Sequence, residues 1–178
     1  MKKSIVASLI VGALAASSQF AMASDGTITI NGLVTSNTCA ISGNGGGKDF
    51  TVTLPSVSAA SLAVAGQTAG RTPFSINLTG CNPVDGGVHA FFEPGPTTDL
   101  ATGRLILAGG GASNVQIGLL NDDFSEIKAG AADASQNSKS VTMAAGAATL
   151  SYYAQYYATG AAVPGVANSS VMYTLSYN

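Results

Sequence analysis

The side chains of this chain that most readily do chemistry are two cysteines and a single histidine. Cys39, Cys81 and His89 are the only residues of these two types among 178. A thiol nucleophile or a metal pair would need further basic or ligating partners, and one histidine supplies few. An exported chain with two cysteines normally oxidises them, so we expect a Cys39 to Cys81 disulfide.

A glycine-rich run over residues 42–49 has the outline of a phosphate-binding loop. It departs from that motif where the chemistry is done. Ser42 stands where the first glycine belongs, and Asp49 replaces the serine or threonine that holds magnesium. We therefore interpret the run as a hairpin loop rich in glycine.

Acidic and aromatic clusters offer two further candidate sites. Asp122, Asp123 and Glu126 could touch a cation but lack the spacing of a calcium loop, so a solvated turn is the simpler interpretation. All six tyrosines lie between Tyr152 and Tyr177. They could form a sugar-binding platform, although neighbours along a strand point to opposite faces, which favours core and cross-strand packing.

No constellation of residues indicates an enzyme. The chain has no G-x-S-x-G elbow, and any Ser-His-Asp triad would have to use His89, which lies in an alternating segment typical of a packed or surface strand. We predict no catalytic residues, no cofactor and no metal site. The chain has seven basic against nine acidic residues, so a basic footprint for nucleic acid is absent.

The first residues predict export. Lys2 and Lys3 precede an apolar run over residues 5–16, and Ala21-Met22-Ala23 has the small-x-small pattern that signal peptidase accepts. The apolar run is shorter than the roughly 20 residues that span a bilayer. We expect residues 1–23 to be a signal peptide, and residues 24–178 to form one domain without membrane insertion.

The rest of the chain predicts an all-β fold. Short segments rich in β-branched and aromatic residues alternate with clusters of Gly, Pro, Asn and Ser, which is typical of a β-sandwich. One segment, residues 56–65, has the pattern of a short helix or helical turn. The last cluster, residues 158–170, is expected to be a loop. The expected strands are residues 33–41, 50–54, 74–79, 88–92, 105–107, 115–120, 141–143, 149–157 and 171–177.

The segment just after the predicted cleavage point alternates with period two. This period places one set of side chains on a single face of a strand, and that face is apolar or bare, so it needs a partner. Asn31-Gly32 is also a strong signal for a tight hairpin within the chain, although its arms of about four residues would be marginal alone. The residues on the face are Gly26, Ile28, Ile30, Gly32 and Val34.

The end of the chain alternates even more regularly. Val171, Tyr173, Leu175 and Tyr177 share one face of the expected last strand. A strand this regular is expected to lie inside a sheet, with neighbours on both sides.

Taken together, these features resemble the major subunits of type 1-like pili, which the chaperone-usher route assembles in Gram-negative bacteria. The likeness runs over nearly all of residues 24–178. At the C-terminal end it includes Gly165, the alternating apolar positions and the penultimate Tyr177. Further matching positions are residues 26–32, Cys39, residues 54–55 and 70–74, Cys81, residues 114–120 and residues 158–165.

The resemblance implies an incomplete immunoglobulin-like β-sandwich, the pilin fold, which lacks its last strand and exposes an apolar groove beside the C-terminal strand. A periplasmic chaperone would first lend a strand to this groove. At the outer-membrane usher, the N-terminal extension of the next subunit would replace it. Residues 24–34 would be that donor extension and residues 35–178 the pilin domain.

The same resemblance assigns roles by position. The donor strand would use Gly26, Ile28, Ile30, Gly32 and Val34. The receiving strand and the surface read by the chaperone would comprise Gly165, Val171, Tyr173, Leu175 and Tyr177, and the chaperone would grip the carboxylate of Asn178. The chain is then expected to be a non-enzymatic subunit of a surface fimbria that polymerises with identical or related subunits and supports adhesion and biofilm formation. The alternative is a minor adaptor or a carbohydrate-binding tip subunit of the same kind of fimbria.

Overall fold

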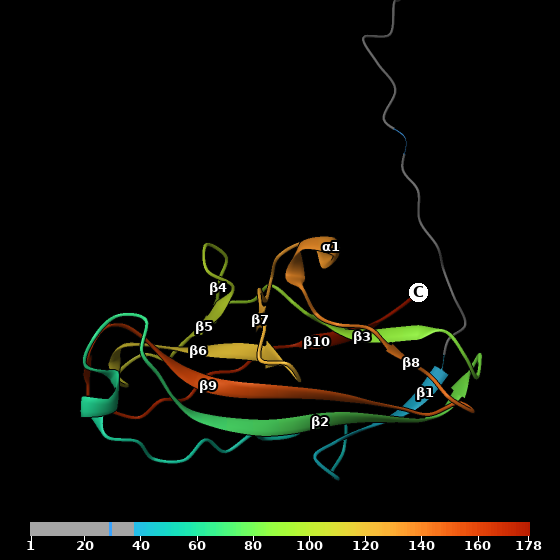
Figure 1. Cartoon of the computed structure of the whole chain (residues 1–178), viewed down its shortest axis with the longest axis horizontal. Helices are drawn as coiled ribbons and strands as arrows, with labels where there is room; N and C mark the ends of the chain where they lie inside the picture. The colour runs from blue at the N-terminus through green and yellow to red at the C-terminus, as the bar shows by residue number, and fades with distance from the viewer. Residues whose placement is uncertain (1–28, 30–37) are drawn as a thin grey trace, which may run out of the picture. The chain divides into compact units, whose positions relative to one another are not determined.

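The computed structural model describes Thr29 and residues 38–178 (Figure 1). The predicted signal peptide and nearly all of the predicted donor extension therefore lie outside the described residues. No helix of the described part is long and apolar enough to cross a membrane.

The regular secondary structure of the described residues is almost entirely β-strand. The long elements are β2 (Thr68–Asn82), β6 (Ser113–Asn121) and β9 (Ala148–Val163). A 3-10 turn, η1 (Ala59–Leu62), and a four-residue helix, α1 (Asp133–Gln136), are the helical elements of this part of the chain. The shorter strands are β1 (Thr38–Gly43), β3 (Gly87–Phe92), β4 (Thr98–Asp99), β5 (Arg104–Ile106), β7 (Glu126–Ile127), β8 (Val141–Thr142) and β10 (Tyr173–Tyr177).

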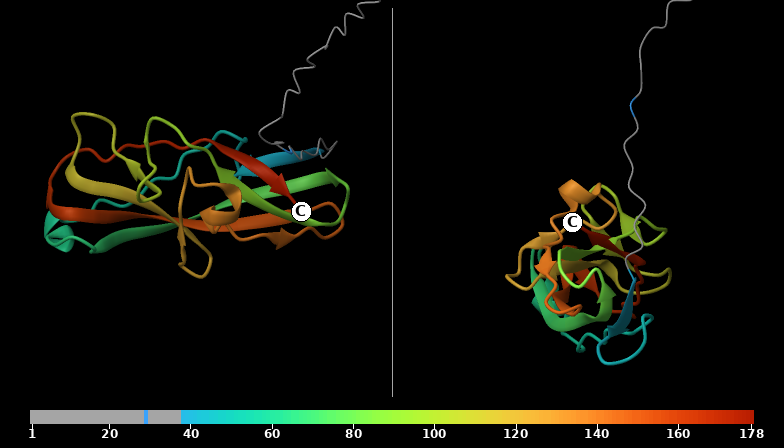
Figure 2. Two further views of the ribbon diagram at one scale, coloured as in Figure 1. Left: turned by 90° about the horizontal axis from the view of Figure 1, so that it is seen from above. Right: turned by 90° about the vertical axis from the view of Figure 1, so that its right-hand side faces the viewer.

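These strands form two antiparallel sheets that enclose one main core. The larger sheet has the order β1-β2-β9-β6-β5-β4, with β7 paired to β6, and the smaller has the order β10-β3-β8. In Figure 2 the end-on view shows the strands curling around the space between them. The expectation of an all-β sandwich is confirmed.

Period-two alternation in the sequence places the core residues. In β2, Phe74, Ile76 and Leu78 are buried while the residues between them are more exposed. Ile76 pairs with Leu150 of β9 across the larger sheet, and β3 contributes Val88, Ala90 and Phe92 from the smaller one. Side chains from both inner faces therefore meet in one cluster.

Several predicted boundaries were wrong. Residues 50–54, expected to be a strand, pair with no strand of the described chain, and residues 56–65 contain only the short turn η1. The segment expected to be a loop from residue 158 instead continues β9 to Val163, because Ser113 and Val115 of β6 pair with Val163 and Ala158. The strands β4 and β7, two residues each, were not predicted.

Candidate functional site

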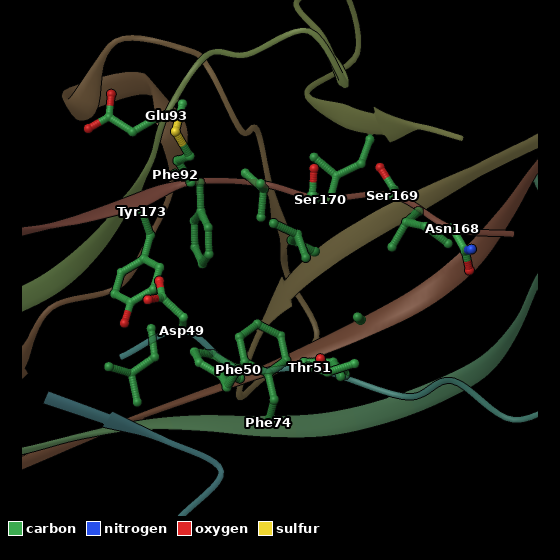
Figure 3. Close-up of a pocket in the computed structure, with 18 of the residues that line it drawn as sticks. Asp49, Phe50, Thr51, Phe74, Phe92, Glu93, Asn168, Ser169, Ser170 and Tyr173 are labelled. Atoms are coloured by element: carbon green, nitrogen blue, oxygen red, sulfur yellow. The ribbon is translucent and has the colours of Figure 1, made fainter. Parts of the chain in front are cut away.

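An apolar groove of about 860 Å³ opens between residues 48–54 on one side and residues 167–174 on the other (Figure 3). Its lining includes buried core side chains of both sheets, so the core of the sandwich forms its floor. Charged side chains, Lys48, Asp49 and Glu93, are few in its lining. The apolar residues between the two sides are Phe74, Ile76, Phe92, Leu105, Ile117, Leu119 and Ala154.

One wall of the groove is the segment that was expected to be a strand. Phe50, Val52 and Leu54 are half-buried and pack against the core, whereas Thr51 and Thr53 are exposed. This alternation is that of a strand, as the sequence indicated. The segment lacks a strand assignment because, among the described residues, no neighbouring backbone forms a ladder with it.

The other wall is formed by β10 and the residues before it. β10 pairs with β3 from Tyr173 opposite Phe92 to Tyr177 opposite Val88. Within the described part of the chain no strand pairs with its other edge, so the second neighbour that the sequence predicts is not among these residues. The prediction of a shared inward face is confirmed, since the odd-numbered residues 171–177 pack against the core while Met172 is 64% exposed.

Backbone hydrogen bonds hold this second wall in place. The amides of Ala108 and Ala112 donate to the carbonyl oxygens of Asn168 and Val166, each at 2.8 Å. Further along, the amide of Glu93 donates to the carbonyl oxygen of Met172 at 2.9 Å. The wall is therefore tied to the loop before β6 and to the end of β3.

Gly165 lies where two stretches of backbone cross. A Cβ atom at Gly165 would come within 2.5 Å of the amide nitrogen of Ala112, and one at Gly111 within 2.1 Å of the carbonyl oxygen of Val166. Both distances are too short for a side chain. Gly165 thus lets the chain turn close to β6 and enter the groove wall, which gives a physical reason for glycine at this predicted position.

The two walls touch at one end of the groove. The Tyr173 hydroxyl donates to the carbonyl oxygen of Lys48 at 2.8 Å, and the Tyr173 ring meets Phe50 edge-on with centroids 6.2 Å apart. Figure 3 shows the aromatic rings gathered here, with Asn168 and Ser169 toward the other end. Burial, with a smaller effect of the nearby Asp49 carboxylate, raises the pKa of Tyr173, which keeps its hydroxyl a donor at neutral pH.

The predicted disulfide lies beside this closed end. Cys39 and Cys81 are joined, with an S–S distance of 2.09 Å, which confirms the pairing. The hydroxyl of Tyr177 lies 3.4 Å from the Cys39 sulfur. The bridge therefore ties the start of β1 to the end of β2.

The other candidate sites are structural. His89 lies on β3 with Nε2 2.7 Å from Oδ1 of Asp133 and Nδ1 3.2 Å from the Ser140 hydroxyl. The glycine-rich run forms the end of β1 and the turn after it, in which the side chain of Asn44 accepts a hydrogen bond from the Ser75 amide.

The acidic cluster is a turn with ordinary surface ion pairs. Asp123 pairs with Lys139, and Glu126 pairs with Arg104 at 3.0 Å. Hydrogen bonds from Lys139 and then Ser125 lower the pKa of Asp123. These contacts favour the interpretation of a solvated turn.

The tyrosines divide between core and surface, as their alternation predicts. Tyr152 is 2% exposed and packs between Phe74 and Phe92. Tyr157, by contrast, lies under the guanidinium of Arg104, with 3.5 Å between that group and the ring centroid. The rings therefore do not share one face as a binding platform would require.

A strand is the molecular shape that fits this groove. Two extended backbone segments border it, neither pairs with the other, and half-buried apolar side chains alternate along both. An added strand would satisfy backbone groups at its edges and bury alternate side chains over the core. The fold and groove thus define a β-sandwich with an apolar groove beside an unpaired strand edge.

Comparisons with known proteins identify the family. The model of the family Type-1 fimbrial protein, A, matches residues 54–178. The chain is 54% identical over 171 residues to the major fimbrial subunit SMF-1 of Stenotrophomonas maltophilia, covering 93% of this chain and 99% of that protein. It is 49% identical over 175 residues to the F17 fimbrial protein of Escherichia coli, covering 94% and 96%.

A solved structure supports the fold independently. A chain of a chaperone-usher pilus superposes with a TM-score of 0.61 over 87% of this chain and 96% of its own length, at 20% identity. The likeness shows that the described domain has the pilin fold. The chain belongs to the type-1 fimbrial protein family, whose members are structural subunits of surface fimbriae.

Proposed function

We propose that this chain polymerises by donor-strand exchange, with residues 24–34 of one subunit filling the groove of the next. The observation that carries this proposal is the apolar groove between two backbone walls that pair with no strand on their facing sides in residues 38–178. The proposed donor face alternates with the period that such a groove requires.

The proposal assigns a position to each apolar residue of the groove and of the donor strand. Val171, Tyr173, Leu175 and Tyr177 form the inward face of the receiving strand, and Phe50, Val52 and Leu54 form the facing wall. Ile28, Ile30 and Val34 of the incoming strand would each contribute roughly 1.5 to 3 kcal/mol if fully buried. Gly26 and Gly32 would lie over the parts of the groove with least room. Because the strand also finishes the acceptor's fold, its release would be as slow as unfolding.

Before assembly, a strand of a periplasmic chaperone would pair with the same edge of β10. At an outer-membrane usher, the donor extension of the next subunit would replace that strand. A chaperone strand fits because the edge offers backbone groups in the described chain that no other strand uses. Asn178 exchanges backbone hydrogen bonds with Gly87 at 2.8 and 2.9 Å, so β10 is held in register to its last residue. That register presents the side chains of β10 at fixed positions to either partner.

The polymer is a passive scaffold in this proposal. Its role in adhesion and biofilm formation would come from the fibre and from whatever the fibre carries, without catalysis by this subunit. A subunit at an adaptor position would use the same groove, so the composition of purified fibres separates the shaft role from the adaptor role.

Deletion of residues 24–34 tests the proposal. The truncated chain should still take up a synthetic peptide of residues 24–34 but should add no subunit to a growing fibre as donor. The control is the Thr29→Asp chain, whose changed side chain faces away from the groove. Fibres of ordinary length from the truncated chain, seen by electron microscopy, would contradict donor-strand exchange.

A further inference from the structure

The smaller sheet has a second edge, on the far side of β3 from β10. β8 covers it only opposite Gly87 and Val88. Ala90 and Phe92 extend beyond β8, with backbone groups directed away from β10. An uncovered strand edge of this kind is a template for pairing with another chain.

Gln136 of α1 takes the place of a neighbouring strand at Phe92. Its Oε1 accepts a hydrogen bond from the Phe92 amide at 2.7 Å, and its Nε2 donates to the Phe92 carbonyl oxygen at 3.0 Å. A primary amide offers the same donor and acceptor as a peptide group. Gln136 is fully buried, at 0% exposure, so this pair of bonds is shielded from water.

At Ala90, the side chain of Tyr152 takes the place of a neighbouring strand. Its hydroxyl, reaching across the core from β9, accepts a hydrogen bond from the Ala90 amide at 3.1 Å. The amide of Gly130 adds a fourth bond along this edge, at 2.9 Å, to the carbonyl oxygen of Phe92. The stretch of the β3 edge beyond β8 is therefore paired by two side chains and one loop amide.

Polar contacts hold α1 over this edge. Asp133 accepts hydrogen bonds from His89 of β3 and, at 3.1 Å, from the hydroxyl of Ser176 on β10. Ser140 bridges His89 and the side chain of Asn178, at 3.2 and 2.9 Å. α1 is thereby tied to both strands beside it.

We infer that Gln136 and Tyr152 close the outer edge of β3, so that the domain accepts an added strand at β10 and not on both sides of the small sheet. The inference rests on the proposed function, because it concerns which edge the donor strand can use. A subunit with one acceptor edge makes an unbranched fibre. A subunit with two would bind two donor strands and branch or aggregate.

The test counts bound donor strands. The mature full-length chain, the Gln136→Ala variant and the Tyr152→Phe variant are each titrated with a labelled peptide of residues 24–34, and native mass spectrometry gives the stoichiometry. We expect one peptide on the unmodified chain and a second on Gln136→Ala. Hydrogen exchange should show that the Ala90 and Phe92 amides are protected in the unmodified chain. Without peptide, the Phe92 amide should lose protection in Gln136→Ala and the Ala90 amide in Tyr152→Phe, and a second bound peptide should restore it.

Two matched variants control for lost stability. Gln155 is 4% exposed, but its side-chain oxygen accepts from Arg71 Nε at 3.0 Å and touches no strand edge, so Gln155→Ala removes a buried amide without opening β3. Tyr153→Phe removes a hydroxyl from the neighbouring, partly exposed ring. Both controls should bind one peptide.

The outcomes separate the two proposals. An unmodified chain that takes up no peptide in the groove between β10 and residues 50–54 would overturn the proposed function. One peptide on the unmodified chain and still one on Gln136→Ala, with the Phe92 amide protected, would overturn the present inference alone. If Gln136→Ala fails to fold, Tyr152→Phe decides, because it keeps the ring and removes the partner of the Ala90 amide, along with a 3.3 Å contact to the Ser138 hydroxyl. A second peptide on Tyr152→Phe would support the inference, and a single peptide would overturn it.

Discussion

The Tyr173 hydroxyl bonds to the carbonyl oxygen of Lys48, a residue 125 positions earlier in the chain, and so joins the two walls of the groove. The contact closes one end of a site that is otherwise open to a strand. On the proposed function, we expect a donor strand that occupies the whole groove to separate these two groups. The bond therefore favours the empty state over the filled one.

Removing this hydroxyl should make the groove easier to fill. A hydrogen bond contributes about 0.5 to 1.5 kcal/mol net, so Tyr173→Phe should speed uptake of the donor peptide by up to roughly tenfold. Stopped-flow fluorescence with a labelled peptide of residues 24–34 measures this rate. Tyr153→Phe, which lies away from the groove, is the control. A slower rate for Tyr173→Phe than for the control would show that the bond does not hold the groove shut.

The backbone crossing at Gly165 should be intolerant of any side chain. A methyl group would collide with the amide of Ala112, and relief requires the groove wall to move. Overpacking of this kind costs about 1 to 3 kcal/mol, so Gly165→Ala should lower the midpoint of urea unfolding. Gly109→Ala is the matched control, because a Cβ there meets nothing within 4 Å. Equal midpoints for the two variants would contradict the crossing.

The disulfide should be a major part of the stability of the free subunit. It closes a loop with a sequence separation of 42 residues, for which chain entropy gives roughly 4 kcal/mol. The Cys39→Ser, Cys81→Ser double variant should therefore unfold at a much lower denaturant concentration. Chemical reduction of the unmodified chain should lower the unfolding midpoint by a similar amount. A midpoint that neither the double substitution nor reduction lowers would refute the stabilising role of the disulfide.

Asp133 should make the fold sensitive to acid. The hydrogen bond from His89 is the main cause that lowers the pKa of Asp133 below its usual value near 3.8. A carboxylate with a lowered folded pKa stabilises the fold above its unfolded pKa and loses that effect as the pH falls through the folded value. The stability gap between the unmodified chain and Asp133→Asn should thus be present at pH 6 and shrink below about pH 4.

Thermal unfolding across pH 2 to 7 measures this gap. Asp122→Asn is the control, since this surface carboxylate forms no ion pair with the residues that the structure describes. A gap that widens as the pH falls would reverse the sign and contradict the assignment.

The elements that could be predicted from the sequence are those with a pattern in neighbouring residues. Alternation identified β3, β6 and the inward face of β10, and the cysteine count led to the disulfide. Alternation also marked Phe50, Val52 and Leu54, but it cannot tell whether an extended segment has a neighbour. That segment was predicted as an ordinary strand although it borders the groove.

Contacts between residues far apart in the chain could not be predicted, because they leave no local pattern in the sequence. Gln136 lies in a polar stretch of the sequence, and no neighbouring residue indicates that it pairs with Phe92, 44 residues away. The pairing of His89 with Asp133 is equally distant in sequence. The extension of β9 to Val163 was missed because its Ala and Gly residues resemble a loop, and it forms because β6 supplies the ladder.

Photo-cross-linking from position 30 in assembled fibres tests most directly whether one subunit completes another. A photoreactive amino acid replaces Ile30, and fibres are grown from a mixture of ¹⁴N- and ¹⁵N-labelled chains so that mass spectrometry separates links within a chain from links between chains. The account predicts mixed-label products joining position 30 to residues 48–54 or 167–177. Products of a single label only, as a hairpin at Asn31-Gly32 would give, would contradict it.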